Sequence, residues 1–305
     1  MIVCTVLSIT LAVYVACPYI FYYFKRVRDT FVFCHFLNIP PPWFHSLKDP
    51  EYFGVENAKT FSILSDEGSI NIWNIKTTNP FIKNGKESVI LYCHGQSCNR
   101  AMSHRVGMYN QLSGMGFNIV TFDYRGFGDS PGNMPSENSV VEDVRIMLQW
   151  VENNFFDHNI FVWGHSLGTG VSVRFISSLE DSSHRISGLV LESPFVNLEE
   201  AGKQFPIAKI FDFLPLTKGV ISNALAGMFP TDELILHITV PILILHAKDD
   251  HILPVSNAIQ LFRTCERNNM DNVQMKIVNE GKHKFLFRNK YAMEAAGNFL
   301  RDFQC

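Results

Sequence analysis

The sequence has few of the features that mark metal sites, disulfide frameworks or nucleic-acid binding. Its seven cysteines are scattered, with no CxxC pair and no Cys/His cluster at metal-ligand spacing. Their number is odd and the chain has 305 residues, so a disulfide scaffold is not implied. Lysine and arginine form no block beyond Lys25-Arg26-Val27-Arg28, and the net charge is −3. We therefore expect no metal, no organic cofactor and no nucleic acid as a partner.

The chain also lacks Asn-x-Ser/Thr sequons, internal repeats and low-complexity tracts. Neither glycosylation sites nor cysteine usage therefore indicates a compartment. Hydrophobic residues make up 47% of the sequence, which excludes disorder of the low-hydrophobicity type. The length suits one large catalytic domain with short additions.

Residues 2–24 contain no charged side chain. At about 1.5 Å per residue, such a helix can cross a hydrocarbon layer roughly 30 Å thick. Tyr19, Tyr22 and Tyr23 stand at one end, as an aromatic belt would. The run lacks the basic start and short apolar core of a cleaved signal peptide. We interpret residues 1–24 as a transmembrane signal anchor, with a cleaved signal or a buried or interfacial helix as the alternatives.

The next stretch, residues 25–57, includes Ile39-Pro40-Pro41-Pro42-Trp43-Phe44 and indicates an irregular connector packed on the domain surface. Two short strand patterns follow, Thr60–Leu64 and Ser69–Ile75, with Asp66-Glu67-Gly68 between them. This arrangement predicts a hairpin.

From there to the C-terminus, apolar strand-like runs alternate with helix-like stretches. The predicted strands are Ser88–Cys93, Phe117–Phe122, Ile160–Trp163, Gly188–Leu191, Pro241–Leu245 and Val273–Val278. The predicted helices are Arg100–Ser113, Glu137–Asn153, Leu167–Ser178, Pro254–Asn268 and Tyr291–Phe303. This order predicts an α/β domain over residues 58–305, with a mostly parallel central sheet and helices on both faces.

The alternation of predicted strands and helices is interrupted over residues 194–237, which carry Pro206, Pro215 and Pro230. We interpret this interval as a short cap insertion above the strand ends. Several of the 26 phenylalanines fall between residues 205 and 229. They suit a hydrophobic pocket or a membrane-facing lid, and equally an ordinary hydrophobic core.

The strongest chemical signal is Gly164-His165-Ser166-Leu167-Gly168, which follows a predicted strand and opens a predicted helix. That context defines a nucleophile elbow, in which glycines flank the serine because the turn is tight. The helix start favours the negative charge that develops in the reaction. We predict Ser166 as the nucleophile. An inert serine in a glycine-bracketed turn is the alternative, and an epoxide hydrolase or dehalogenase would need Asp at this position.

A serine nucleophile needs a base, which this fold supplies on the loop before the last helix. Among eleven histidines, only His283 lies there. We expect His165 to point away from the nucleophile. Other histidines lie at helical or loop positions where we expect solvation: His104, His158, His184 and His237.

The base needs an orienting acid, expected just after the strand Pro241–Leu245. Asp249 and Asp250 both lie there. The loop pattern favours Asp250, whereas Asp249 suits a capping or solvated role.

The reaction's oxyanion needs backbone N–H donors. The residue after the nucleophile, Leu167, should supply one. The loop His94-Gly95-Gln96-Ser97-Cys98 should supply the other, from Gln96, because Gly95 permits a close approach of the backbone. The side chains of His94, Asp123 and Arg125 are interpreted as structural.

Six motifs, in this order along the chain, resemble one branch of the α/β-hydrolase superfamily: LYCHGQSCNR, FDYRGFGDSPG, WGHSLGTGVS, LVLESPFVNLEEA, ILILHAKDDHILP and GKHK. This branch holds the membrane-anchored lysophosphatidylserine and monoacylglycerol lipases, α/β-hydrolase domain-containing protein twelve and its relatives. The similarity runs from about residue 30 to the C-terminus. It implies that Ser166, Asp250 and His283 form the catalytic triad. It also implies a single-chain lipid ester as substrate and a lumenal or extracellular catalytic domain.

Together the residues and the resemblance predict a membrane-bound serine esterase that cleaves a lysophospholipid or monoacylglycerol. A depalmitoylase, thioesterase or peptidase on the same triad and a non-catalytic binding protein are the alternatives. We expect a single-pass protein of the endoplasmic reticulum. Its orientation stays open, because the basic residues after the anchor favour a cytosolic domain and the resemblance a lumenal one.

Overall fold

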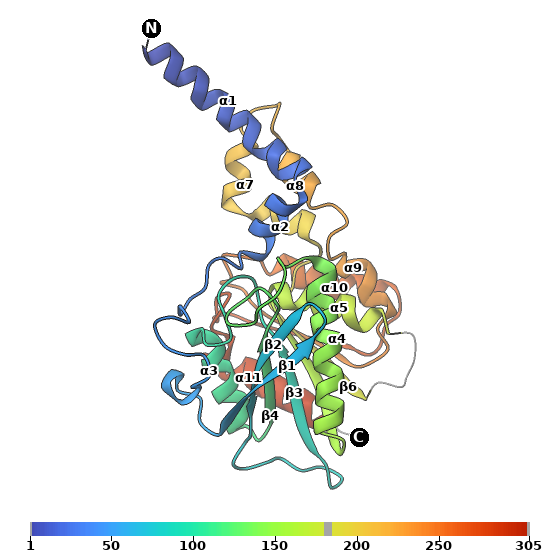
Figure 1. Cartoon of the computed structure of the whole chain (residues 1–305). Coiled ribbons are helices and arrows are strands. Elements are labelled where there is room, and N and C mark those ends of the chain that lie inside the picture. The colour runs from blue at the N-terminus through green and yellow to red at the C-terminus, as the bar shows by residue number, and fades with distance from the viewer. Residues whose placement is uncertain (1, 180–184, 304–305) are drawn as a thin grey trace.

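A twisted sheet of eight strands forms the centre of the computed structural model, which describes residues 2–179 and 185–303 (Figure 1). The strand order is β1-β2-β4-β3-β5-β6-β7-β8. The first two form the predicted hairpin and β2 pairs antiparallel with β4, whereas every later pairing is parallel. The strands are β1 (Ala58–Ser65), β2 (Gly68–Ile75), β3 (Glu87–Cys93), β4 (Asn118–Asp123), β5 (His158–His165), β6 (Ile186–Glu192), β7 (Ile242–Ala247) and β8 (Val273–Val278).

Each face of the sheet carries its own hydrophobic core. Along β5, Ile160 and Val162 point into one core, whereas Phe161 and Trp163 point into the other. This alternation follows from the two-residue period of a strand, and it explains why the central strands read as unbroken apolar runs. The sheet is therefore covered on both sides, as predicted.

Helices cover the two faces in a regular division. Residues of α4 (Glu137–Asn154), α5 (Leu167–Ser177) and α10 (Ser256–Arg267) belong to the first core. Residues of α3 (Ser103–Gly114) and α11 (Lys290–Asp302) belong to the second. Each parallel strand thus ends at the same edge of the sheet, where the loops that follow β3, β5, β7 and β8 meet.

Two helices precede this domain. The first, α1 (Ile2–Tyr23), projects away from it, and its residues Cys4–Tyr23 are long and apolar enough to cross a membrane (Figure 1). The second, α2 (Lys25–Phe33), occupies the start of the predicted connector, so the expectation of an irregular segment is wrong there. Val32 and Phe33 are buried in the first core, and this packing makes the short helix favourable.

Four short helices lie between β6 and β7: α6 (Leu198–Gln204), α7 (Pro206–Phe211), α8 (Val220–Ala224) and α9 (Thr231–Leu234). Residues of α7 and α8 contact α1, and Figure 1 shows them beside the part of α1 nearest the domain. Short 3-10 turns occur at Glu51–Phe53, Ile235–His237 and Leu286–Arg288.

Candidate active site

Ser166 stands at a sharp turn between β5 and α5. Its φ of 52° is a strained conformation that costs about 1–3 kcal/mol and clusters at functional sites. The flanking glycines allow the turn, since a Cβ on Gly164 would lie 2.5 Å from the carbonyl oxygen of Gly168, and one on Gly168 would lie 2.1 Å from that of Cys93. The sequence GHSLG therefore folds as a tight strand–turn–helix that raises the serine side chain at the sheet edge.

His283 and Asp250 converge on this serine from two other loops. The Nε2 atom of His283 lies 2.9 Å from Ser166 Oγ, and its Nδ1 lies 2.8 Å from Asp250 Oδ2. The imidazole and the carboxylate are both buried. Ser166, Asp250 and His283 thus form one chain of hydrogen bonds, although the bonded pairs are 33 and 117 positions apart in the sequence.

The carboxylate of Asp250 is held in its charged form by several donors. Its Oδ1 accepts backbone hydrogen bonds from Ile252 and Leu253, both at 2.9 Å, and His246 Nε2 lies 3.2 Å from Oδ2. Burial alone would raise the pKa of Asp250, but hydrogen bonds from His246 and His283 outweigh burial and lower that pKa below its ordinary value. Asp250 can therefore orient the imidazole and stabilise its positive charge.

Asp249, the competing candidate, does not contact His283. Its Oδ1 accepts a hydrogen bond of 2.7 Å from the backbone N–H of Lys282, so it ties the β7 loop to the β8 loop. Its side chain is therefore a loop link, in accord with the capping role considered from the sequence.

The loop after β3 passes directly against the nucleophile. A Cβ on Gly95 would lie 3.1 Å from Ser166 Cβ, so only glycine lets the backbone approach this closely without displacement. Gln96 follows at once and lines the cavity beside Ser166. Leu167 opens α5, so its N–H is among those of the first helical turn that lack an intrahelical acceptor. Gln96 and Leu167 thus both lie beside Ser166, and their role as oxyanion donors stays a prediction.

This loop, residues 94–98 and here called the β3 loop, is held from outside. Ser97 and Cys98 have φ values of 62° and 60°, which side-chain-bearing residues rarely adopt. The Gln96 side chain donates to the carbonyl oxygens of Phe31 and Val32, at 3.0 and 2.7 Å. The backbone N–H of Ser97 donates to Phe33 at 3.0 Å. The last turn of α2 therefore fixes the conformation of the β3 loop.

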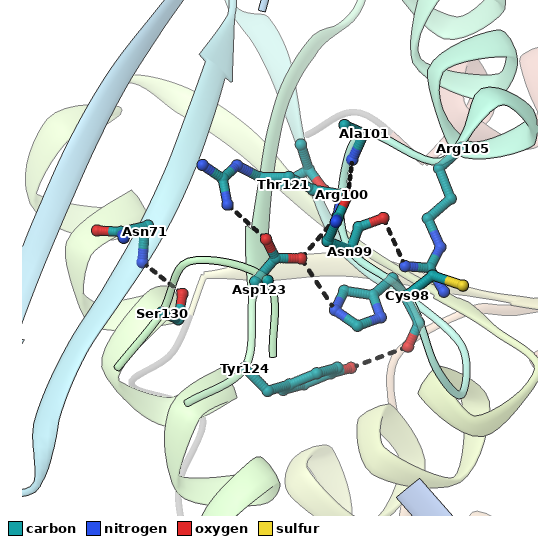
Figure 2. Close-up of polar contacts among 12 residues, drawn as sticks. Asn71, Cys98, Asn99, Arg100, Ala101, Arg105, Thr121, Asp123, Tyr124 and Ser130 are labelled. Atoms are coloured by element: carbon teal, nitrogen blue, oxygen red, sulfur yellow. Dashed lines mark hydrogen bonds and ion pairs between the residues drawn. The ribbon is translucent and has the colours of Figure 1, made fainter. Parts of the chain in front are cut away.

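Arg105 holds the same loop from the opposite side. Its guanidinium, buried on α3, donates to the carbonyl oxygens of Gly95, Ser97 and Asn99 at 3.0, 2.8 and 2.7 Å, and Figure 2 shows it beside Asn99. Five N–H groups in a fixed fork make arginine suited to gathering several carbonyls. No sequence pattern indicates this role, because a charged residue on a helix normally faces water.

A second buried network stabilises the base of the β3 loop. Asp123, at the end of β4, accepts hydrogen bonds from the backbone and side chain of Arg100, and Figure 2 shows the two facing each other. His94 is buried, with its Nε2 3.5 Å from Asp123 Oδ1. Arg125 pairs with Asp143 of α4 and Glu67 of the hairpin turn. These side chains join loops, as predicted.

A cavity of about 180 Å³ opens beside Ser166 and His283. Its wall is largely apolar, with Val32 from α2 and residues from the segments after β6 and β7: Phe195, Leu198, Ala201, Phe205, Ile252 and Leu253. Such a lining suits an acyl chain. Within residues 2–179 and 185–303, no group of three or more His, Cys, Asp or Glu side chains is placed to hold a metal ion.

Two histidines lie near the site, and one of them differs from expectation. His104 is buried rather than solvated, and burial lowers its pKa. His165 turns away from Ser166, as expected, but its Nε2 lies 2.9 Å from the carbonyl oxygen of His283, so it supports the base. Burial, followed by the proximity of His283, lowers the pKa of His165 to about 3. It is therefore neutral at pH 7 and does not oppose a charge on His283.

The remaining histidines considered from the sequence lie away from Ser166. His237 is exposed as expected, His158 is half-buried, and His184 lies outside the described residues. Sequence patterns do not single out Glu192. This side chain is buried beneath the elbow, where its backbone oxygen accepts the Ser166 N–H at 2.9 Å and its carboxyl accepts the Trp163 indole N–H at 2.8 Å. Burial raises the pKa of Glu192 to about 8.

Comparison with known proteins agrees with this geometry. Residues 85–225 match a family model described as serine aminopeptidase, S33. Lysophosphatidylserine lipase ABHD12 of Danio rerio is 32% identical over 95% of this chain and 81% of its own length. The protein of the same name from Mus musculus is 33% identical over 82% of this chain and 66% of its own length.

Solved structures share the fold at lower identity. An α/β-hydrolase from Vibrio vulnificus superposes with a TM-score of 0.71 at 17% identity, covering 90% of this chain and 94% of its own. The Pyrococcus furiosus esterase Pf2001 gives a TM-score of 0.65 at 21% identity, covering 83% and 93%. The sheet order, the serine turn and the curated relatives lead to one conclusion: the chain belongs to the lysophosphatidylserine lipase ABHD12 family of serine ester hydrolases with the α/β-hydrolase fold.

Proposed function

We propose that this protein hydrolyses the acyl ester of a single-chain lipid, a lysophospholipid such as lysophosphatidylserine or a monoacylglycerol. The observation that carries the proposal is the hydrogen-bonded chain Asp250–His283–Ser166 at the wall of an apolar cavity. The activity for which the relatives from Danio rerio and Mus musculus are named supports a lysophosphatidylserine substrate.

In the proposed reaction, Ser166 Oγ attacks the acyl carbonyl while His283 Nε2 takes its proton. The new C–O bond converts the carbonyl oxygen into an oxyanion, which accepts hydrogen bonds from the backbone N–H groups of Gln96 and Leu167. His283 then gives its proton to the departing glycerol oxygen. Water, deprotonated by His283, attacks the acyl-enzyme and releases the fatty acid.

The role of Asp250 in this scheme follows from its contacts. Its Oδ2 faces His283 Nδ1, so it selects the tautomer in which Nε2 is free to accept the serine proton. Its Oδ1 is occupied by Ile252 and Leu253, which prevents the carboxylate from rotating. The acid is thus fixed on the base.

Membrane attachment belongs to the same proposal. The helix Cys4–Tyr23 has the length and apolarity to anchor the enzyme where its substrates reside, and its side chains are largely exposed along its length. We further propose the endoplasmic reticulum as its location. Protease protection of sealed microsomes decides the orientation, because a lumenal catalytic domain survives added protease and a cytosolic one is degraded.

Labelling with a fluorophosphonate probe tests the nucleophile. The wild-type chain is expected to be labelled and Ser166→Ala to lose all labelling, while Ser62→Ala, on the exposed face of β1, keeps it. Labelling that persists in Ser166→Ala would refute the assignment. A wild-type chain that never reacts would instead favour a binding protein on a hydrolase fold.

Substrate class is tested separately from the nucleophile. Purified enzyme is offered lysophosphatidylserine, other lysophospholipids, monoacylglycerol and S-acylated peptides under the same conditions. The proposal expects the single-chain lipid esters to be cleaved at least tenfold faster than the acyl-peptides. The reverse order would identify a thioesterase or depalmitoylase on the same triad.

A further inference from the structure

The loop between α6 and α8 carries large apolar side chains that no part of the described chain covers. Residues 208–219 comprise the end of α7 and the turn that follows it, and are here called the α7 loop. In it, Phe213 is 87% exposed, Leu216 68% and Ile210 59%. These values are high for a segment that lies between two packed helices. Grouped exposed apolar residues of this kind mark a surface that meets another apolar phase.

The α7 loop is fastened to α1 at two levels. The Tyr14 hydroxyl donates to the carbonyl oxygen of Ile210, and the Tyr19 hydroxyl donates to that of Leu216 at 2.6 Å. The ring of Tyr14 also packs on Phe211, with centroids 5.2 Å apart. Figure 1 shows α7 beside α1, outside the body of the sheet domain.

These contacts give the α7 loop a depth along α1. Tyr14 precedes Tyr23, the last residue of α1, by nine residues, which corresponds to about 13 Å at a rise of 1.5 Å per residue. Tyr19 lies about 6 Å from the same end. If α1 enters a bilayer, the loop therefore enters the same leaflet, between the level of Tyr19 and that of Tyr14.

We propose that the α7 loop is a second membrane contact, inserted with α1 into the outer part of one leaflet. Its backbone chemistry fits that environment. Inside hydrocarbon, every exposed carbonyl needs a donor, and the phenol groups of α1 satisfy the carbonyls of Ile210 and Leu216 at that depth. In water, solvent molecules would donate to both carbonyl oxygens, and no tyrosine hydroxyl would be needed.

The charges of the loop fit an interfacial position. Lys209 and Lys218 are exposed at its two ends, and their long stems allow the ammonium groups to reach lipid phosphates. Asp212 is turned inward, where its Oδ1 accepts the Gly219 N–H at 2.8 Å. The apolar tip thus meets lipid without an outward carboxylate.

This contact explains how the cavity meets the membrane, and that part rests on the proposed function. Leu198 and Ala201 of α6 and Phe205, the residue after it, line the cavity directly before the α7 loop. Val32 lines it from α2, directly after α1. Each of these two walls is continuous along the chain with one membrane contact, the first with the α7 loop and the second with α1. A single-chain lipid therefore reaches Ser166 from the leaflet without crossing water.

Fluorescence quenching tests the contact without reference to activity. The full chain carrying Phe213→Trp is reconstituted in phosphatidylcholine–phosphatidylserine vesicles, with and without lipids brominated on the acyl chain. The matched control is Phe156→Trp, equally exposed at 79% but placed before β5, at the end of that strand opposite Ser166. After subtraction of the wild-type spectrum, bromine is expected to quench the residue-213 emission at least twofold and leave that of residue 156 unchanged. Quenching of both by aqueous iodide alone would overturn the proposal.

A charge at the same position tests the route to the site. Phe213→Asp is expected to lower hydrolysis of lysophospholipid in vesicles at least tenfold, and to leave hydrolysis of a soluble short-chain ester within twofold of wild type. Phe156→Asp should change neither. Equal vesicle rates for Phe213→Asp and wild type would overturn the route. If the wild type cleaves no ester, the proposed function fails, and the quenching experiment still decides the membrane contact.

Discussion

The two sides of Ser166 are built in different ways. On the base side, Asp250 and His283 stand on the loops that follow two neighbouring parallel strands, and local backbone N–H groups fix the carboxylate. On the side of the proposed oxyanion donors, here called the oxyanion side, the β3 loop has two residues in a rarely populated conformation and depends on α2 and on Arg105. The base side is thus assembled by the sheet itself, whereas the oxyanion side borrows its geometry from segments outside the sheet.

The largest effect is expected on the base side. In Asp250→Asn, one amide oxygen can still accept from Ile252 and Leu253, which turns the NH2 group toward His283 Nδ1 and favours the wrong tautomer. We expect kcat to fall by about 10⁴-fold, as for the equivalent change in other triads. Steady-state hydrolysis measures it, with His251→Ala, an exposed neighbour, as the control. A loss below tenfold would show that the carboxylate does not orient the base.

A smaller effect is expected on the oxyanion side. Gln96→Ala keeps the backbone donor but removes the two hydrogen bonds to the end of α2, so the loop can move away from the oxyanion position. Complete loss of one such donor costs about 10²–10³ in kcat, so a displaced donor should cost about 10–100-fold with little change in KM. Gln111→Ala, on the exposed face of α3, is the control. A change in KM alone would contradict the assignment, because donors to an oxyanion act on the transition state.

The smallest effect is expected at Glu192, which is buried beneath the turn at Ser166. The pKa of its carboxyl is about 8 in the folded chain against an ordinary value of 4.5, so the folded state holds a proton that the unfolded chain releases. Its contribution to stability is therefore complete below about pH 4.5 and is lost as the pH rises toward 8. Glu192→Gln removes this dependence and can still accept from Trp163.

Thermal unfolding at several pH values measures the difference. We expect the Tm of Glu192→Gln, relative to wild type, to rise steadily between pH 5 and pH 8, by about 2–4 °C for each kcal/mol of relieved burial cost. A Tm difference that stays constant over this range would mean that Glu192 ionises normally in the folded protein.

The same contrast governs what the sequence could predict. The succession of strands and helices along the chain, the GHSLG turn and the positions of Asp250 and His283 follow from local patterns, and the structure brings the three side chains within hydrogen-bonding distance. Their catalytic roles stay predictions. Local patterns could not show that Arg105 gathers carbonyls or that His104 is buried, because both depend on segments that meet only in the folded chain.

The helix α2 was missed for a related reason. Its nine residues carry three basic side chains in the first turn and a weak apolar face, and it is stabilised by contacts distant in sequence, among them the packing of Val32 and Phe33 in the sheet core. The spread of phenylalanines between residues 205 and 229 was equally ambiguous. Phe229 belongs to the core and Phe213 is exposed, a division that composition alone does not encode.

Because Gln96 and Ser97 donate hydrogen bonds to the end of α2, the part of the chain that shapes the active site begins before the sheet domain. A form cut at Phe24 retains the carbonyls of Phe31, Val32 and Phe33, and with them the template on which the β3 loop is folded. One cut at Cys34 removes that template together with the anchor. Phe24, the single residue between α1 and α2, is therefore the point at which the anchor can be removed without removing the contacts of α2 to the β3 loop.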